Sequence, residues 1–343
     1  MRRLLWICWF LPIPILAVSG GFLSELRHPY YNAAEEETFV YIPPGANAAE
    51  VAGLLKDQGI LHTRLPFRFW LRHNGLDRRL KAGEYRFSGK ATPVDIAERI
   101  TRGDVYFRSI TIAEGLTAME IVELLARAGF GDSKKLEAAI SRADLINDLN
   151  PSARNLEGYL FPETYRFGRR DDENAVIGAM VGQFRNRMDK ILKESPLQGG
   201  WTVARIVTLA SLIEKEVKTP AERPIVASVL TNRLRLRMTL GVDASIIYAM
   251  KLAGTWDGNI RSSDLRMESP YNTYIHGDLP PGPICNPGES AIRAALNPEK
   301  TDYLYYVSKN DGTHQFSKDL RSHNNAVNLY QRSGRPPNGG RGQ

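Results

Sequence analysis

The stretch from Thr202 to Asp243 reads TVARIVTLASLIEKEVKTPAERPIVASVLTNRLRLRMTLGVD and decides the fold of the region around it. Its first half has apolar residues at spacings of three and four, which is typical of a helix with one buried face. The residues of this apolar stripe are Val203, Ile206, Val207, Ala210, Ile213 and Val217. The sequence therefore predicts a long helix with one apolar face.

Two carboxylates lie near the end of this predicted helix. Glu214 continues the apolar stripe, because Val207 and Ala210 precede it on the same face. Glu216 lies about 200° further round a helix of 3.6 residues per turn, so the two side chains point apart. Burial disfavours the charged form of a carboxyl group and raises its pKa, which suits a proton donor near neutral pH. The alternative is that Glu214 marks the point where the stripe meets solvent.

The segment after this helix contains signals for a tight corner. Thr219–Glu222 has the form of a capping box, with a proline at the first helical position, and so predicts the start of a second helix. This second helix is expected to end at about Arg237. Gly241 then breaks the pattern, and Asp243 opens the next segment. Two helices joined by so short a corner would hold Glu214 rigidly.

Five segments of the chain resemble one family of bacterial cell-envelope enzymes. They are LASLIEKEV (Leu209–Val217), ERPIVASVLTNRL (Glu222–Leu234), SPYNTY (Ser269–Tyr274), LPPGPICNPG (Leu279–Gly288) and DYLYYV (Asp302–Val307). Together they are similar to the endolytic murein transglycosylases, the MltG or YceG-like family. The resemblance runs from the first apolar segment to about Tyr330. It implies that the first Glu of the EKE triplet, Glu214, is the catalytic acid/base.

The composition is ordinary for a folded protein of two domains or so. The chain has 343 residues, 43% of them hydrophobic and 24% charged, with a net charge of +7. No recognisable nucleic-acid motif accompanies this mild positive charge, so we expect no nucleic-acid partner. Cys8 and Cys285 predict no disulfide, and no cluster of side chains has the spacing of metal ligands. His314 and His323 also lack such spacing and are interpreted as structural.

Residues 1–24 predict a membrane anchor. Arg2 and Arg3 precede the uncharged segment Leu4–Leu23, whose 20 residues would span about 30 Å as a helix. Basic residues before an apolar segment place the N-terminus in the cytoplasm, so the remaining chain is expected outside the bacterial inner membrane. The alternative is a cleaved signal peptide, because Ala17–Ser19 has the small residues of a cleavage site.

Residues 38–131 contain an internal repeat. Ile42–Gly45 is followed by an amphipathic segment that ends at Gly59, and Ile112–Gly115 is followed by a similar one that ends at Gly129. Each copy predicts a strand, a glycine turn and a helix. These small α/β units resemble the LysM-like subdomain that the family carries before its catalytic domain, and LysM modules bind glycan chains. A spacer that lifts the active site off the membrane is the alternative.

Residues 150–332 are predicted to form a mixed α+β catalytic domain, and residues 333–343 a disordered tail. The segment Glu157–Tyr165, EGYLFPETY, resembles the family motif EGYLFPxTY. Aromatic rings beside carboxylates suit sugar binding, so we expect Glu163 to be the second acidic residue near the cleft. A buried aromatic corner is the alternative.

The segment Ser269–Gly288 contains five prolines and three glycines, so it is predicted to be a shaped loop that lines a cleft. Tyr271, Asn272 and Tyr274 of this loop are predicted substrate contacts. Asp278 stands where the family usually has a glycine, so the family's backbone geometry is not transferred to that position. After the loop we expect a helix to Leu296 and a hairpin of two strands, Tyr303–Ser308 and His314–Ser317.

The mechanism that these residues suggest needs one carboxyl group. An acid protonates the leaving oxygen of a β-1,4 bond between N-acetylmuramic acid and N-acetylglucosamine, and the muramic acid's own 6-hydroxyl closes a 1,6-anhydro ring. Glu214 is the predicted acid/base. Ser211, Asn232, Arg233 and Asp243 are further predicted substrate contacts, of which Ser211 would bond either the substrate or the Glu214 carboxylate. No metal or cofactor is expected.

Two other functions remain open from the sequence. A hydrolase would use Glu214 with Asp243 or Glu163 and leave reducing ends, whereas a glycan-binding scaffold would not depend on Glu214. The resemblance further implies association with penicillin-binding proteins and a role in limiting glycan strand length.

Overall fold

The computed structural model describes Leu26 and residues 37–332. The predicted anchor and the predicted tail lie outside the described residues. Within the described part of the chain, no helix is long and apolar enough to cross a membrane. The chain divides into two compact units: the first ends at Arg108 and includes Gly168–Arg170, and the second contains Ser109–Phe167 and the chain from Asp171 onward. Both contain helices and short strands, which confirms the mixed α+β class.

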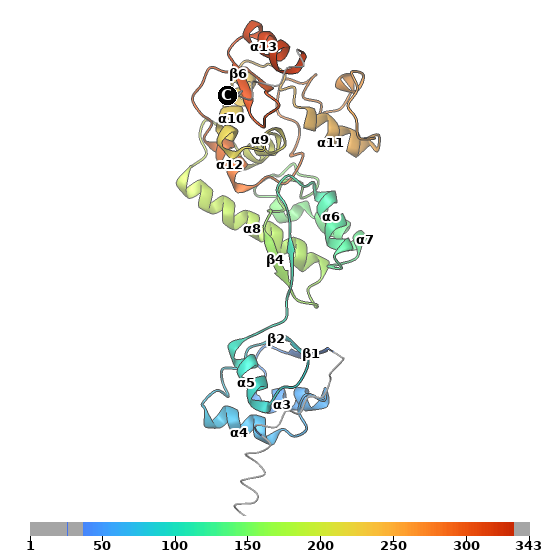
Figure 1. Cartoon of the computed structure of the whole chain (residues 1–343), viewed down its shortest axis with the longest axis vertical. Helices are drawn as coiled ribbons and strands as arrows, with labels where there is room; N and C mark the ends of the chain where they lie inside the picture. The colour runs from blue at the N-terminus through green and yellow to red at the C-terminus, as the bar shows by residue number, and fades with distance from the viewer. Residues whose placement is uncertain (1–25, 27–36, 333–343) are drawn as a thin grey trace, which may run out of the picture. The chain divides into compact units, whose positions relative to one another are not determined.

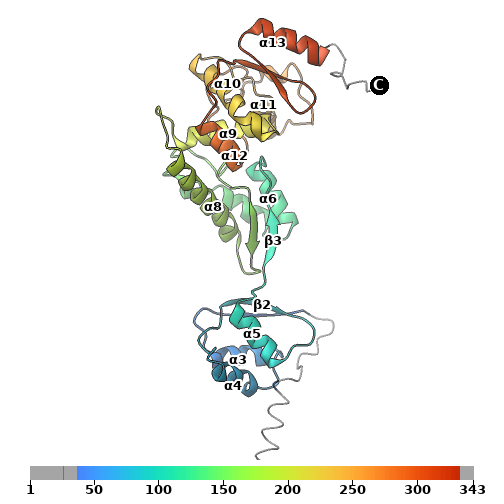
Figure 2. The same ribbon diagram turned by 60° about the vertical axis from the view of Figure 1, so that its left-hand side comes forward.

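The first unit packs three helices on one side of a two-stranded antiparallel ribbon (Figures 1 and 2). Its elements are β1 (Thr38–Ile42), α3 (Ala48–Asp57), α4 (Leu65–His73), β2 (Gly83–Phe87) and α5 (Pro93–Arg102). Val40 of β1 lies opposite Tyr85 of β2, and both side chains are buried. Together with the apolar faces of the helices they form a separate hydrophobic core.

The predicted repeat is present as local structure, but its two copies belong to different units. The second copy forms β3 (Arg108–Thr111) and α6 (Ala118–Arg127). In both copies the helix begins with a reciprocal capping box. The turn glycines also match, with φ of +80° at Gly45 and +78° at Gly115. The division at residue 108 differs from the predicted subdomain 38–131, because the apolar face of α6 packs into the core of the second unit.

The second unit is built around α9 (Val203–Glu216), the helix that the apolar stripe predicts. Three further helices pack against α9 (Figures 1 and 2): α10 (Arg223–Arg235), α11 (Asp243–Ala253) and α12 (Glu289–Leu296). The other regular elements are α7 (Ser133–Ile140), β4 (Thr164–Phe167), α8 (Glu173–Glu194), β5 (Tyr305–Ser308), β6 (His314–Ser317) and α13 (Leu320–Val327). Short turns of helix lie at η1 (Ala143–Ile146), η2 (Pro220–Glu222), η3 (Asp264–Arg266) and η4 (Asn328–Arg332).

The corner after α9 differs from its prediction. Pro220–Glu222 is a short 3-10 turn, and α10 follows it directly. Thr219 does not cap this turn with its side chain, because its hydroxyl donates to the carbonyl oxygen of Gly312 at 3.2 Å. Glu222 instead accepts a hydrogen bond from the backbone N–H of His314 at 3.0 Å. The hairpin engages both side chains, so the predicted capping box is wrong.

The long loop between α11 and α12 has no helix or strand from residue 269 to residue 288, as predicted. Hydrogen bonds fix it instead. The carbonyl oxygen of Thr273 accepts from the N–H of Gly241, and its hydroxyl accepts from the N–H of Val242, both at 2.9 Å. The Asn286 side chain accepts from the N–H of Leu160 at 2.8 Å. After the loop, β5 and β6 pair in antiparallel fashion, which confirms the predicted hairpin.

Gly158 allows this loop to approach α9. Its φ is +86°, and a Cβ atom added there would lie 2.4 Å from Cγ of Pro283 and 2.9 Å from Cγ1 of Val207. We expect Gly158→Ala to lower the free energy of unfolding by about 2 kcal/mol or more, because a steric clash adds to an unfavourable left-handed backbone. Urea unfolding measures this change.

Gly178→Ala is the matched control. Gly178 lies inside α8, and nothing stands within 4 Å of an added Cβ atom. An alanine inside a helix is more stable than a glycine by roughly 0.5–1 kcal/mol, so this variant should be the more stable one. Equal stability of the two variants would contradict the assignment of Gly158 as a close contact.

Candidate active site

The carboxylate of Glu214 forms a buried ion pair at the end of α9. Its Oε1 atom lies 2.7 Å from Nη2 of Arg223, and both side chains are only 6% exposed. The backbone N–H of Gly288, just before α12, donates to Oε2 at 3.0 Å. The same Arg223 nitrogen lies 3.5 Å from the carboxylate of Glu114, which is 47% exposed. The Glu214 carboxylate therefore links α9, α10, α12 and the loop before α6.

The pKa of Glu214 is raised, chiefly because burial removes the carboxylate from water. The Gly288 N–H and the positive charges of Arg223 and Lys215 oppose this shift, while the nearby carboxylate of Glu114 adds to it. Two strong donors to the ionised form stand against desolvation here. Such an arrangement suits a structural ion pair better than a carboxyl group that must give a proton to a substrate.

Glu216 points to other partners, as its position on the helix predicts. The hydroxyl of Tyr306, on β5, donates to Oε2 of Glu216 at 2.7 Å. Burial raises the pKa of Glu216, and the negative charge of Asp243 raises it further. The Tyr306 hydrogen bond and the positive charges of His314 and Arg233 act in the opposite direction. The hydrogen bond that this carboxyl group accepts thus comes from a neutral hydroxyl.

Three of the predicted substrate contacts gather near Glu216. Asp243 opens α11 and is exposed, and the hydroxyl of Tyr274 from the long loop donates to its carboxylate. Arg233 donates from Nη1 to the carbonyl oxygen of Leu240 at 2.7 Å, so its guanidinium stays beside this pair. Gly241 lies beside both side chains with a φ of +64°, and a Cβ atom there would be in ordinary van der Waals contact, 3.6 Å from Nη1 of Arg233 and 3.8 Å from Cε1 of Tyr274. We call Glu216, Tyr306, Asp243, Tyr274 and Arg233 the Glu216 cluster.

The structure places Ser211, Asn232 and Asn272 in backbone-supporting positions. The buried hydroxyl of Ser211 donates to the carbonyl oxygen of Thr208 and accepts from the N–H of Ile284, rather than bonding the Glu214 carboxylate as the sequence suggested. The Asn232 amide donates to the carbonyl oxygens of Thr301 and Tyr303. The fully buried Asn272 amide donates to those of Leu265 and Met267. These contacts engage the three side chains with backbone groups of the protein.

Glu163 and Tyr271 lie outside the Glu216 cluster. The carboxylate of Glu163 pairs with Arg187 of α8 at 2.9 Å, and Gln183 approaches the same oxygen at 3.4 Å. Tyr271 instead packs against Tyr248, with ring centroids 4.9 Å apart, at the wall of a separate cleft. The hydrogen-bonding pattern therefore gives no support to Glu163 as the second acidic residue of the cleft.

Sequence reasoning missed Glu216, Tyr306 and Glu157. The apolar stripe selects Glu214 and gives no reason to bury Glu216, whose burial comes from the hairpin. Tyr306 stands in the DYLYYV segment, inside the predicted strand Tyr303–Ser308, and this family-like motif was the available signal. Glu157 is buried, and its carboxyl group accepts from the N–H of Ala118 at 3.0 Å and from the hydroxyl of Tyr248 at 3.3 Å.

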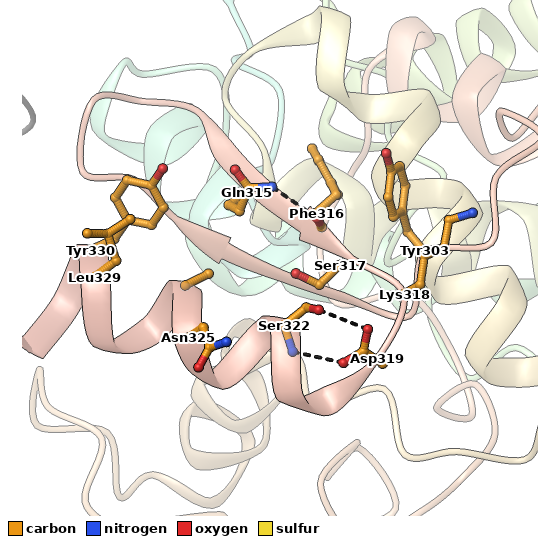
Figure 3. A pocket seen from close by; sticks show the side chains of 11 residues that line it. Tyr303, Gln315, Phe316, Ser317, Lys318, Asp319, Ser322, Asn325, Leu329 and Tyr330 are labelled. Atoms are coloured by element: carbon orange, nitrogen blue, oxygen red, sulfur yellow. Dashed lines mark hydrogen bonds between the residues drawn. The ribbon is translucent and has the colours of Figure 1, made fainter.

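No group of three or more His, Cys, Asp or Glu side chains in the described part of the chain is arranged to hold a metal ion. A groove of about 470 Å³ lies between the hairpin and α13 (Figure 3). Its one carboxylate, Asp319, caps α13 by accepting from the N–H and the hydroxyl of Ser322. None of the predicted site residues lines this groove.

The corner at the end of α9, the hairpin and the long loop bring carboxyl and tyrosine side chains together on an α+β scaffold. The chain belongs to the YceG-like family, whose model matches residues 40–329.

Three similar proteins, two compared by sequence and one by structure, have descriptive names. A protein of Bacillus subtilis (strain 168) named endolytic murein transglycosylase is 33% identical over 334 residues, covering 92% of this chain and 91% of the relative. A protein of Streptococcus pneumoniae serotype 2 (strain D39 / NCTC 7466) with the same name is 29% identical, covering 93% of this chain and 64% of the relative. A crystal structure of a YceG-like protein from Listeria monocytogenes has a TM-score of 0.56 and 31% identity, covering 85% of this chain and 99% of that chain.

The buried ion pair makes a stability prediction. Glu214→Gln leaves the buried Arg223 with only the more distant and half-exposed Glu114 carboxylate as a charged partner, so we expect the free energy of unfolding to fall by about 3 kcal/mol. Urea unfolding measures the change. Asp302→Asn is the control, because its ion pair with Lys318 has side chains that are 81% and 63% exposed and should contribute less than about 1 kcal/mol. Similar small losses in both variants would show that the pair does not stabilise the corner.

Proposed function

We propose that this protein is an endolytic murein transglycosylase, which cleaves the β-1,4 bond between N-acetylmuramic acid and N-acetylglucosamine inside a peptidoglycan strand. Membership of the YceG-like family and two relatives with this name support the activity. The observation that carries the mechanism is the buried Glu216 carboxyl group, with its raised pKa, beside the exposed Asp243.

We assign the acid/base role to Glu216 rather than to Glu214, the residue that the family resemblance and the stripe indicate. Both carboxyl groups have raised pKa values. The difference lies in their partners: Glu214 is held by the guanidinium of Arg223, whereas Glu216 is held by the neutral hydroxyl of Tyr306. A guanidinium favours the ionised form and occupies the oxygen that would approach a substrate. Glu214 stays the alternative candidate.

The reaction requires one carboxyl group to act twice. Protonated Glu216 donates its proton to the glycosidic oxygen, and the bond from this oxygen to C1 of the muramic acid breaks. The 6-hydroxyl of the same sugar attacks C1 and returns its proton to the Glu216 carboxylate. No water is consumed, and the product carries a 1,6-anhydro ring. A raised pKa favours the protonated form of the acid, and the intramolecular hydroxyl supplies proximity.

The other members of the Glu216 cluster have supporting roles in this proposal. Positive charge develops near C1 when the bond breaks, and the exposed carboxylate of Asp243 is placed to stabilise it. Tyr274 orients this carboxylate by donating a hydrogen bond. Arg233, fixed by the carbonyl oxygens of Leu240 and Leu304, remains beside the cluster and is available to hydroxyl or carboxyl groups of the strand.

The membrane location, the role of the first unit and the partners of the enzyme are part of the same proposal. The uncharged segment Leu4–Leu23 supports a single-pass anchor in the bacterial inner membrane, with the catalytic unit on the periplasmic side. The strand-turn-helix architecture of the first copy of the repeat supports a LysM-like glycan-binding role for the first unit. Association with penicillin-binding proteins and limitation of glycan strand length follow from the family resemblance.

The products identify the reaction and its acid. We expect the full-length chain to release anhydromuramic ends from purified sacculi, as read by mass spectrometry. Glu216→Gln should reduce these ends by about a thousand-fold or more, because an amide cannot donate the proton. Glu214→Gln should retain activity in the fraction that folds, so activity is normalised to folded protein. Loss of activity in folded Glu214→Gln with activity preserved in Glu216→Gln would reverse the assignment.

A hydrolase is the second candidate function, since Asp243 lies close enough to Glu216 for its charge to raise the pKa of that group. In such a pair, one carboxyl group acts as the acid and the second acts either as a nucleophile or as a base that activates water. Reducing ends in place of anhydromuramic ends from the wild type, abolished by Asp243→Asn, would establish this function and overturn the transglycosylase.

The pH dependence tests the role of Tyr306. An acid must be protonated, so kcat/KM should fall as pH rises through the pKa of Glu216. The Tyr306 hydroxyl lowers this pKa by stabilising the carboxylate. Tyr306→Phe removes that donor and should move the basic limb of the profile to higher pH. A limb that does not move in Tyr306→Phe would show that Glu216 does not set it.

A further inference from the structure

A second cleft lies on the elements that carry the Glu216 cluster. It has a volume of about 560 Å³ and is lined by the segment 150–155, Tyr248 of α11, and Tyr271 and Pro281–Pro283 of the long loop. We call it the Tyr271 cleft. Tyr248 stands five residues after Asp243 on α11, or about 7.5 Å along the helix axis. Tyr271 precedes Tyr274 by three residues on the same loop. The cleft and the cluster therefore use different residues of the same helix and the same loop.

The wall of the cleft offers an aromatic ring and apolar proline faces. Tyr271 is half-buried and rests on the buried Tyr248, with an angle of 57° between the rings. Gly282 passes close to the end of this ring, since a Cβ atom there would lie 3.3 Å from the Tyr271 hydroxyl. The prolines on either side of Gly282 line the same cleft. A fixed tyrosine face of this kind stacks on the C–H surface of a sugar ring.

The floor of the cleft contains a hydroxyl group without a hydrogen-bond partner. Tyr159 lines the cleft and is fully buried, and its hydroxyl makes no hydrogen bond of good geometry to any residue of the described chain, although Asn150 lies nearby. Buried polar groups are almost always paired, because an unpaired one costs free energy. A ligand carbonyl group in the cleft would accept the hydrogen bond after a small adjustment of the floor.

The charge of the cleft suits an uncharged ligand. Burial raises the pKa of the Glu157 carboxyl group, which lines the cleft, to about 8 and so favours its neutral form. Arg154 is the one cation among the described residues that line the cleft, and it is exposed at the rim near the Tyr271 hydroxyl. A peptide stem with several carboxylates would call for more cations than this. A neutral sugar with an acetamido group fits the prolines through its methyl group and the Tyr159 hydroxyl through its carbonyl oxygen.

We propose that the Tyr271 cleft is a subsite for an N-acetylated sugar of the glycan strand. The subsite rests on the proposed function, because a peptidoglycan strand supplies the N-acetylated sugar. Binding there holds the strand on the enzyme without taking part in proton transfer. It also makes the enzyme prefer acetylated strands.

Binding measured without turnover tests the subsite. The full-length Glu216→Gln variant is titrated calorimetrically with chitotetraose, the β-1,4-linked tetramer of N-acetylglucosamine, and with cellotetraose, which lacks acetamido groups. We expect chitotetraose to bind at least about ten-fold more tightly, since acetamido contacts are lost with cellotetraose. Adding Tyr271→Ala should weaken chitotetraose binding by about ten-fold through the lost stacking.

Tyr159→Phe is the more specific variant, because it keeps the aromatic ring. It removes only the unpaired hydroxyl, so the melting temperature should stay the same or rise, whereas chitotetraose binding should weaken by about five-fold. Tyr330→Ala is the control, because Tyr330 is a tyrosine that lines the separate groove beside α13 (Figure 3). Adding Tyr330→Ala to the Glu216→Gln variant should leave its affinity for chitotetraose unchanged.

Two binding outcomes would overturn the subsite. Equal binding of the two tetramers, or binding unaffected by both Tyr271→Ala and Tyr159→Phe, would rule it out. Displacement of chitotetraose by free peptide stems would assign the cleft to the peptide instead. The proposed reaction is judged separately by its products: anhydromuramic ends without Tyr271-dependent binding would overturn the subsite alone. Tyr271-dependent binding without any anhydromuramic ends would keep the subsite and overturn the reaction.

Discussion

The buried contact between Glu214 and Arg223 is the constraint on which the catalytic unit depends. It joins the last turn of α9 to the first turn of α10, and the Gly288 N–H ties the start of α12 to the same carboxylate. Two charges with so little exposure are stable only as a pair. This pairing fixes how α9 ends, and so it fixes the direction in which Glu216 is presented to the hairpin and the long loop.

The division of labour between the two carboxyl groups follows from this geometry. Both are withdrawn from water, which raises both pKa values. One has a permanent cation as partner and the other has a phenol hydroxyl. Desolvation alone therefore does not identify a catalytic acid. In our proposal, the hydrogen-bond partner of a buried carboxyl group decides its role: a guanidinium partner suits a structural ion pair, and a hydroxyl partner suits a proton donor.

The sequence predicted the features that depend on local chemistry. The apolar stripe predicts α9, the alternating segments and turn residues predict β5 and β6, and helical spacing predicts that Glu214 and Glu216 diverge. The partners of these carboxylates were not predictable in the same way, because Arg223 and Tyr306 meet them only after the helices and the hairpin have packed. The capping box failed for that reason. Polar residues of the recognisable motifs, such as Asn272, turned out to support loop backbone, since a segment without helix or strand must pair its carbonyl groups by other means.

The first unit includes a short segment that comes much later in the chain. Arg169 places its guanidinium 4.0 Å from the ring centre of Phe39, and Arg170 lies 4.1 Å from that of Tyr41, so Gly168–Arg170 completes the outer surface of β1. During synthesis from the N-terminus, the ribosome must therefore translate the whole stretch Ser109–Phe167 before the earlier unit receives its last contacts. The N-terminal unit therefore gains its last contacts only after part of the second unit has been synthesised.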